Sequence, residues 1–393
     1  MKIRLTFDML ANGRLADAQG ALVCEMAQGK AECLLKYDFD PRPLRLCADA
    51  QPGDRIELRL MDHRIELAVN GEVQDEEWPC GTCLWQGGEI PGAKAEAYEE
   101  PCQTLPCVLG TFENAEGWRP EGSIFVGDCM PYVHDGRYHV LYLKDRRHHS
   151  SKWGRGAHQW EHLSTDDFVH WQIHPMAVPI TDAAEGSICT GSWIEARGKQ
   201  YLFYTVRTVD GSPASIRRSV SEDGYHFEKD EDFRVFLPEK YDQPSARDPK
   251  VICAPDGSWH MFLTTTLLSE NRGCLAHLVS DDLDHWRDVG GPIWLSGDQS
   301  QPECPDYIVY NGKHYLISSL HWGARYLVSD QPFGPWKQLT DDPIPCSSVP
   351  KGAVWKDKII FTGFKPLGPY GGVMTFVQAT AEMDGRLVFE PLK

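Results

Sequence analysis

A short motif recurs along most of the chain, and it constrains the fold more than any other feature. Residues 164–171 read Ser-Thr-Asp-Asp-Phe-Val-His-Trp, and related segments follow at residues 221–227, 280–286 and 329–336. In each copy we expect a strand ending in Ser to lead into an Asp-containing turn, after which an aromatic residue opens the next strand. The copies lie roughly 50–60 residues apart, which is the length of one four-stranded propeller blade.

Each copy is preceded by an aromatic and β-branched stretch with its own Gly turn, such as residues 138–143 after Asp135-Gly136. This composition is typical of strands. A fifth unit lacks the Ser-Asp turn but keeps a strand pair at residues 352–355 and 358–362. We therefore predict an all-β protein with a five-bladed β-propeller over residues 115–393. A β-sandwich with coincidental turns is the alternative.

The first part of the chain has a different pattern. Residues 54–60 and 64–70 alternate apolar and polar side chains with a period of two, as half-buried antiparallel strands do. Asn70-Gly71 supplies a hairpin turn. We predict a small β-sandwich domain over residues 1–95 and a linker over residues 96–114.

Charge and cysteine content limit the partners that we expect. The chain has 39 Lys and Arg against 57 Asp and Glu, a net charge of −18, and no basic block. Nucleic acids and anionic lipid surfaces are therefore unexpected partners. The N-terminal stretch shows no apolar segment followed by a small-residue cleavage site, and the 13 Cys form no regular framework. We expect reduced thiols and a cytoplasmic location. The sequence does not predict an oligomeric state.

Three acidic residues occupy the early part of different predicted blades, where the innermost strands lie. Asp128, Asp248 and Glu303 each precede the aromatic strand of their repeat. Innermost strands converge on the channel, so these carboxylates should lie close together. Repulsion between their charges should then raise the pKa of at least one of them. Such a set separates a protonated acid from an ionised base or nucleophile, as glycoside hydrolysis requires. The alternative is that the acids only accept hydrogen bonds from turn amides.

The propeller portion resembles glycoside hydrolase family 32, the β-fructofuranosidases. The resemblance rests on Arg247-Asp248-Pro249, on Glu303-Cys304-Pro305-Asp306 and on the stretch from Trp160 to Trp171. Cys189-Thr190-Gly191-Ser192 stands where the family has a Ser-Gly-Ser segment in its second blade. The motifs occur in the family's order, and the propeller portion that the resemblance covers is about 280 residues long.

The resemblance implies a role for each acid. Asp128 would be the nucleophile, Glu303 the general acid and base, and Asp248 a transition-state stabiliser. Arg247 would hold Asp248 and keep it ionised. Family members usually carry a lectin-like sandwich after the propeller, whereas the sandwich predicted here precedes it.

The first blade departs from the family pattern. The family usually reads Trp-Met-Asn-Asp-Pro-Asn-Gly around its nucleophile, but Gly127, Cys129 and Met130 replace the first Asn, the Pro and the second Asn. Leu143 stands where a Gln commonly contacts the sugar. Polar contacts to the bound sugar are thereby lost, and such losses change specificity by orders of magnitude.

A loop rich in His, Arg and Trp follows the first aromatic strand. We expect it to contact sugar at the mouth of the channel, with Trp153 and Trp160 as stacking platforms and Asp145, Arg146 and His158 as hydroxyl partners. Alternatives are a metal site on His148, His149 and His158, or a solvated loop without a role. The expected sugar contacts also include Arg247, Thr190 and Trp322.

We expect no cofactor and no metal. Cys80-Gly-Thr-Cys83 with Cys102 and Cys107 offers a four-thiolate zinc site as an alternative to free, buried thiols.

The function that these observations favour is a retaining exo-glycoside hydrolase that cleaves terminal β-fructofuranosyl residues from small oligosaccharides. One alternative is an inverting arabinofuranosidase or xylosidase built on a propeller. Another is a propeller that binds carbohydrate without catalysis. The separation of the carboxylates distinguishes retention, about 5–5.5 Å, from inversion, about 6.5–9.5 Å.

Overall fold

The computed structural model describes residues 2–38, 41–61, 63–79, 81–99, 105–122, 124–146, 158–182, 184–209, 211–321 and 323–392. Within these ranges the secondary structure consists of strands, apart from a three-residue 3-10 turn at Gln243–Ser245. The prediction of an all-β protein is confirmed. No helix in the described ranges is long and apolar enough to cross a membrane.

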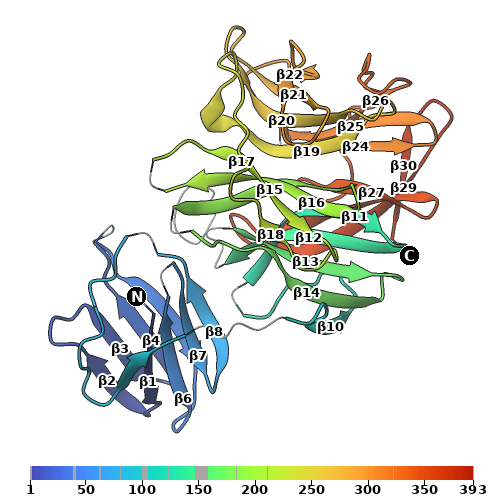
Figure 1. Cartoon of the computed structure of the whole chain (residues 1–393). Helices are drawn as coiled ribbons and strands as arrows, with labels where there is room; N and C mark the ends of the chain where they lie inside the picture. The colour runs from blue at the N-terminus through green and yellow to red at the C-terminus, as the bar shows by residue number, and fades with distance from the viewer. Residues whose placement is uncertain are drawn as a thin grey trace. The chain divides into compact units, whose positions relative to one another are not determined.

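The chain forms two compact units, which consist mainly of residues 1–104 and 105–393 (Figure 1). In the first unit, one sheet has the order β8-β7-β6-β1-β9 and the other has the order β2-β3-β4-β5. The strands are β1 (Ile3–Asp8), β2 (Asn12–Ala16), β3 (Leu22–Ala27), β4 (Lys30–Leu35), β5 (Leu44–Asp49), β6 (Arg55–Leu60), β7 (Ile65–Val69), β8 (Glu72–Glu77) and β9 (Lys94–Ala97).

Side chains from both sheets of the first unit form one hydrophobic core. Leu5, Leu58 and Leu67 from one sheet and Leu35 and Leu46 from the other are fully buried members of it. The alternating pattern of the sequence produces this arrangement, because successive side chains of a strand point to opposite faces. Between β7 and β8, Asn70 and Gly71 both have positive φ, as the predicted hairpin turn requires.

The second unit consists of five successive antiparallel meanders. The first contains β11 (Ile124–His134), β12 (Arg137–Arg146), β13 (Gln159–Thr165) and β14 (His170–Val178), with β10 (Gly110–Glu113) at its edge; the second contains β15 (Glu185–Ala196), β16 (Lys199–Thr208), β17 (Ser215–Ser221) and β18 (Glu228–Lys229). The third contains β19 (Arg247–Cys253), β20 (Trp259–Leu267), β21 (Arg272–Ser280), β22 (Arg287–Asp288) and β23 (Trp294–Leu295); the fourth contains β24 (Glu303–Tyr310), β25 (Lys313–Leu320) and β26 (Gly323–Ser329); the fifth contains β27 (Lys351–Trp355), β28 (Lys358–Pro366), β29 (Gly372–Ala381) and β30 (Leu387–Pro391).

The first and last meanders are joined, since β11 pairs with β29 at Val126 and Gly372. The N-terminal strands β6 and β7 pair within the first unit, and β30 pairs with β29. The segment predicted as a linker, residues 96–114, contains the end of β9, which pairs with β1, and all of β10, which pairs with β14. Each end of that segment is thus part of a sheet.

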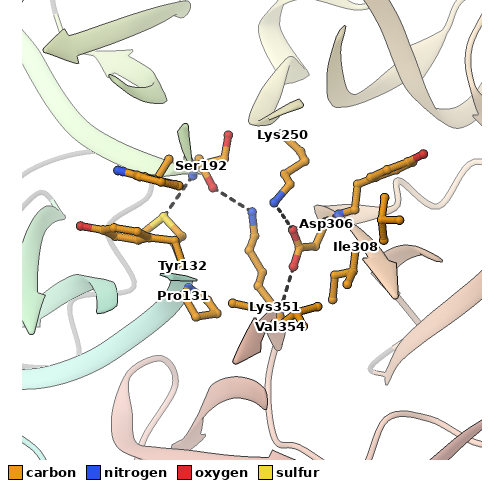
Figure 2. A pocket seen from close by; sticks show the side chains of 15 residues that line it. Pro131, Tyr132, Ser192, Lys250, Asp306, Ile308, Lys351 and Val354 are labelled. Carbon is orange, nitrogen blue, oxygen red and sulfur yellow. Dashed lines mark hydrogen bonds and ion pairs between the residues drawn. The ribbon is translucent and has the colours of Figure 1, made fainter. Parts of the chain in front are cut away.

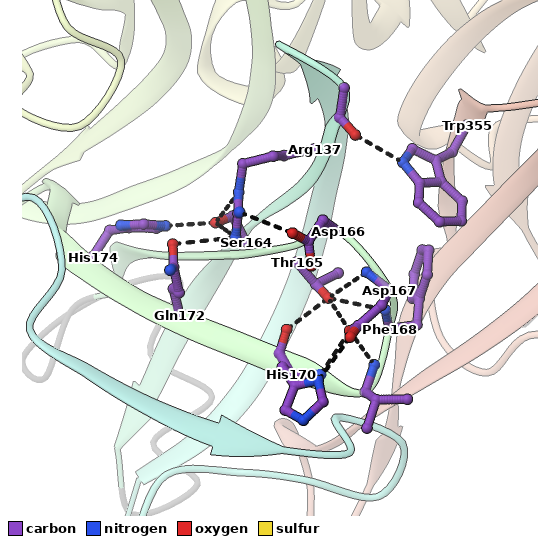
Figure 3. A network of polar contacts seen from close by, with 12 residues as sticks. Arg137, Ser164, Thr165, Asp166, Asp167, Phe168, His170, Gln172, His174 and Trp355 are labelled. Carbon is purple, nitrogen blue, oxygen red and sulfur yellow. Dashed lines mark hydrogen bonds and ion pairs between the residues drawn. The ribbon is translucent and has the colours of Figure 1, made fainter.

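The repeated motif forms the same turn in three meanders. Asp167, Asp223 and Asp282 each accept hydrogen bonds from the backbone N–H groups two and three residues later, and each contacts the following His. Figure 3 shows the first copy. The bonds align Thr165, rather than Ser164, with Ser221 and Ser280. The repeat register in the first copy is therefore one residue later than the sequence letters suggested.

The first strands of all five meanders meet around one cavity of about 240 Å³. Its wall includes Met130 of β11, Gly191 of β15, Lys250 of β19, Asp306 of β24 and Lys351 of β27. Figure 2 shows the two ammonium groups and the carboxylate facing one another across it. Five segments that are far apart in the sequence thus converge.

Candidate active site

Three of these first strands carry a β-bulge at the same place in their ladders. The register shifts between Val126 and Cys129 in β11, between Arg247 and Lys250 in β19, and between Glu303 and Asp306 in β24. Bulges redirect side chains and are common beside active sites. Each of the three acids lies at or next to one of these bulges.

The acids do not occupy equivalent bulge positions. The last paired residue before the bulge is Val126 in β11, Arg247 in β19 and Glu303 in β24. Glu303 is thus itself that residue, Asp248 lies one position after it, and Asp128 lies two positions after it. Asp248 and Cys304 both have positive φ, at 57° and 51°. Three staggered positions on three strands therefore bring the acids together.

Asp128 is buried and surrounded by hydrogen-bond donors. The Tyr370 hydroxyl donates to Oδ1 at 2.7 Å, the Thr190 hydroxyl donates to Oδ2 at 2.5 Å, and the Cys304 thiol lies 3.4 Å from Oδ2. Hydrogen bonds to both oxygens stabilise the ionised carboxylate. Thr190, expected to contact sugar, instead contacts this acid.

Arg247 links the other two acids. Its Nη2 lies 2.8 Å from Oε1 of Glu303, and its Nε lies 3.6 Å from Oδ2 of Asp248. The backbone N–H of Cys304 donates to the same Asp248 oxygen at 3.0 Å. Glu303 and Asp248 thus share one guanidinium, and Cys304 contacts Asp248 through its backbone N–H and Asp128 through its thiol.

Burial raises the pKa of Asp248 above its ordinary value, although the Arg247 guanidinium opposes the change; the charges of Glu303 and Asp128 add to the rise. The sequence predicted that clustered carboxylates would raise at least one pKa, and Asp248 is such a group. The Arg247 guanidinium favours the ionised form of Asp248, as the sequence predicted, but the loss of hydration at this buried carboxyl has the larger effect on its pKa.

Asp128 and Glu303 lie on the wall of one cavity of about 690 Å³. Asp248 is not among its described lining residues and is only 4% exposed. The rest of the wall comes from the segment before β24, from the fourth and fifth meanders and from the segment between these two meanders. These residues are Ser300, Gln301, Ser319, Leu320, His321, Gly323, Ala324, Pro343, Ile344, Cys346, Ser347, Ser348, Val349, Phe364, Pro366, Gly368, Pro369 and Tyr370.

The described residues among those predicted to contact sugar at the channel mouth are all buried, namely Asp145, Arg146, His158 and Trp160. Trp160 is fully buried and donates its Nε1–H to the carbonyl of Cys189, so its ring is unavailable as a stacking platform. Asp145 and His158 are also fully buried, and His158 Nε2 lies 3.4 Å from Asp145 Oδ1. Neither Asp145 nor His158 is among the described lining residues of the cavity that holds Asp128 and Glu303. Trp153 and Trp322, like His148 and His149, lie outside the described residues.

Sequence reasoning missed Tyr370. It follows β28 in a Pro- and Gly-rich turn, and no local pattern connects it to Asp128. The sequence did contain one signal, next to Asp128: Gly127 stands where family 32 usually has Asn. A Cβ on Gly127 would lie 2.6 Å from the Tyr370 hydroxyl, so this glycine leaves the space that Tyr370 fills.

One group of possible metal ligands occurs among the described residues. Cys107, Asp223 and His226 place ligand atoms within 4.8 Å of one another. Both ring nitrogens of His226 already have partners, since Nδ1 contacts Asp223 and Nε2 contacts the carbonyl of Leu105. This group fits the repeated turn better than a metal centre. Cys80 and Cys102 of the zinc hypothesis lie outside the described residues.

The cavity shown in Figure 2 places charge close to the acids. Lys250 lies 2.5 Å from Asp306, and Lys351 donates to the carbonyl of Gly191 at 2.9 Å. Burial lowers the pKa of Lys351, although Asp306 opposes the change. The first contact joins β19 and β24, which carry Asp248 and Glu303, and the second joins β27 and β15.

Asp128 and Glu303 form a pair of carboxyl groups on one cavity wall, and glycoside hydrolases use such a pair. Comparison with known proteins gives the family. Residues 129–333, just over half of the chain, match the description "Glycosyl hydrolases family 32 N-terminal domain". The chain belongs to this family. The match begins directly after Asp128, in keeping with the altered motif of the first meander.

The relatives include two bacterial sucrose-6-phosphate hydrolases. The chain is 34% identical over 196 residues to sucrose-6-phosphate hydrolase of Bacillus subtilis, which covers 46% of this chain and 40% of that protein. It is 30% identical over 214 residues to sucrose-6-phosphate hydrolase of Escherichia coli, covering 52% and 41%. The match thus spans about two fifths of the length of these relatives.

A solved structure shares the fold. Fructan 1-exohydrolase IIa from Cichorium intybus aligns with a TM-score of 0.59 at 17% sequence identity, over 72% of this chain and 61% of that one. At this identity the likeness concerns the fold alone.

Proposed function

We propose that the protein is a retaining exo-glycoside hydrolase that removes terminal β-fructofuranosyl residues from small oligosaccharides. The observation that carries the proposal is that Asp128 and Glu303 share the wall of one cavity. About 690 Å³ lies within the size range of pockets that enclose small molecules. Membership of family 32 supports the choice of fructoside as the substrate class.

Each acid has a contact pattern that suits its proposed role. Donors at both oxygens of Asp128 favour the carboxylate, the form that attacks the anomeric carbon. The side chain of Glu303 is 41% exposed, so it can exchange protons with the leaving group and then with water. Arg247 holds Glu303 in place and also contacts Asp248, and neither Arg247 nor Asp248 is among the described lining residues of the cavity.

The reaction would proceed in two displacements. In the first, the Asp128 carboxylate forms a bond to the anomeric carbon while Glu303 transfers its proton to the departing glycosidic oxygen. In the second, Glu303 removes a proton from water, the water oxygen bonds to the anomeric carbon, and the bond to Asp128 breaks. The two inversions give retention.

The cavity wall favours an uncharged sugar. Among its described lining residues, Ser300, Gln301, Ser319, Ser347 and Ser348 offer neutral polar groups, and none is Lys or Arg. A phosphate group usually requires such a cation. We therefore propose unphosphorylated β-fructosides as substrates, in contrast to the sugar phosphate named for the bacterial relatives.

The proposal extends to the fold and the location. We propose that the five meanders are the blades of one propeller, supported by their first strands lining one cavity, and that residues 1–95 form a separate sandwich domain, supported by its own two-sheet core. A cytoplasmic location is supported by free thiols at all eleven described cysteines. Cell fractionation tests that location.

The decisive experiment compares Asp128→Asn and Glu303→Gln with surface controls, Asp281→Asn and Glu222→Gln, whose side chains are 80% and 81% exposed. Sucrose, sucrose 6-phosphate and small fructans are assayed with arabinosides and xylosides. Both active-site variants should lose most turnover and both controls should keep it. With an activated aryl fructoside, azide should rescue Glu303→Gln, because azide attacks without losing a proton.

Three outcomes oppose the proposal. Near-wild-type turnover by Asp128→Asn refutes its role as nucleophile. Reaction in methanol should give the β-methyl fructoside, and the inverted product would favour the alternative inverting hydrolase. A wild-type protein that binds fructosides without cleaving any would favour the non-catalytic carbohydrate-binding propeller.

A further inference from the structure

Tyr370 and Asp128 form a closed pair of hydrogen bonds across 242 residues of sequence. The backbone N–H of Asp128 donates to the Tyr370 hydroxyl at 3.0 Å, and that hydroxyl donates to Oδ1 of the same aspartate at 2.7 Å. One phenol therefore binds both the backbone and the carboxylate of the proposed nucleophile. Thr190 holds the opposite oxygen, so the carboxylate is fixed from two sides.

The surrounding backbone leaves a space that fits this phenol. A Cβ on Gly127 would lie 2.6 Å from the hydroxyl oxygen and 2.9 Å from the ring carbon Cε1 of Tyr370. Any larger residue at position 127 would displace the ring. The absence of a side chain at Gly127 and the presence of the Tyr370 hydroxyl are thus two parts of one arrangement.

The ring itself is held by buried residues. The His158 imidazole stacks on it at a centroid distance of 4.9 Å, and the Phe364 ring packs against it edge-on at 5.2 Å. Gly371 has a φ of 71° and brings the backbone so close to Asp145 that a Cβ there would lie 2.4 Å from Oδ2. The buried Asp145 and His158 therefore support the turn that carries Tyr370.

We propose that Tyr370 is a positioning residue for the nucleophile, which fixes the Asp128 carboxylate and favours its ionised form. This inference rests on the proposed function, in which Asp128 attacks the sugar. The hydroxyl donates to the anion, and this bond is weaker when the carboxyl is protonated and is lost when the hydroxyl is removed. It supplies a contact to the nucleophile from the fifth meander, beside a motif that has lost the family's Asn.

Tyr370→Phe removes only the hydroxyl. Losing one hydrogen bond to a charged group should reduce kcat/KM by roughly 10- to 100-fold, through a lower kcat and not through a higher KM. The acid limb of the pH profile of kcat/KM should move to higher pH by about one unit, because the carboxylate has lost a donor. Burial raises the pKa of Tyr370 well above its usual value, so the hydroxyl remains a donor throughout the profile.

The matched control is Tyr315→Phe. Tyr315 is fully buried and donates one hydrogen bond, to the carbonyl of Gly385, away from the acids. This variant should lose some thermal stability but keep the wild-type kcat and pH profile. If Tyr370→Phe behaves as this control does, or if it raises KM alone, the positioning role is refuted.

A second measurement does not depend on turnover. The carboxyl carbon of Asp128 is identified in 13C-labelled protein as the signal missing from Asp128→Asn, and its titration is followed in wild type and in Tyr370→Phe. The titration midpoint should rise by about one unit in the variant. An unchanged midpoint would refute the inference even if the wild-type protein cleaves fructosides. A raised midpoint in a protein without turnover would support the hydrogen bond and oppose only the proposed function.

Discussion

Lowering the pH from about 7.5 to about 5 should destabilise the second unit, because buried histidines there resist protonation. Burial, with a smaller contribution from neighbouring histidines, lowers the pKa of His139 and of His277 to about 3 each. An unfolded histidine titrates at about 6.5. Since the folded pKa is the lower one, the stabilisation is present above about pH 6.5 and is lost as the pH falls toward 3.

The magnitude follows from the difference between the two states. A pH of about 5 is about 1.5 units below the pKa of an unfolded histidine, which is therefore protonated, whereas His277 in the folded protein is neutral. At about 1.36 kcal/mol per unit, each such histidine lowers the free energy of unfolding by about 2 kcal/mol. His277→Gln should therefore reduce the pH-dependent loss of stability by about 2 kcal/mol.

The assay is urea denaturation of the full chain at both pH values, followed by tryptophan fluorescence. The control is His285→Gln, whose exposed imidazole has a raised pKa because of its contact with Asp282. Its stabilisation is present below about pH 6.5 and is lost as the pH rises, so removing it should make the acid-induced loss larger. If His277→Gln shows the full wild-type loss between the two pH values, the reasoning from burial is refuted.

Two further predictions concern the strands around the acids. Gly191→Ala should lower the free energy of unfolding by about 3 kcal/mol or more, because its Cβ would lie 1.8 Å from the backbone oxygen of Phe203. Thermal unfolding should show a strongly lowered melting temperature. A melting curve like that of wild type would contradict the packing of β15 on β16. Arg247→Lys should reduce kcat/KM by at least about tenfold while the protein stays folded, since one ammonium cannot contact Glu303 and Asp248 with the planar geometry of a guanidinium. Steady-state kinetics and circular dichroism check this, and unchanged kinetics would exclude a role for the shared guanidinium.

Local sequence patterns were sufficient to predict the repeated architecture. The Gly turns at Asp135-Gly136 and Asn311-Gly312 have the positive φ values that short hairpins require, and both were readable as pairs of adjacent letters. The Ser-Asp motif was equally local, because its hydrogen bonds join residues two or three apart. The same locality explains the error of one residue at Ser164, where a second hydroxyl next door fits the pattern.

The sequence by itself determined the all-β class and the repeat, and it predicted the three acids, since each depends on neighbouring residues or on a motif of a few letters. Only the tertiary structure showed that Trp160 and His158 are buried and that Tyr370 reaches Asp128. Composition could not separate a sugar-binding aromatic from a core aromatic, because both are apolar rings with one polar atom. The contact between Tyr370 and Asp128 forms because the closing of the first and last meanders brings together residues that are 242 positions apart. No local pattern carries that information.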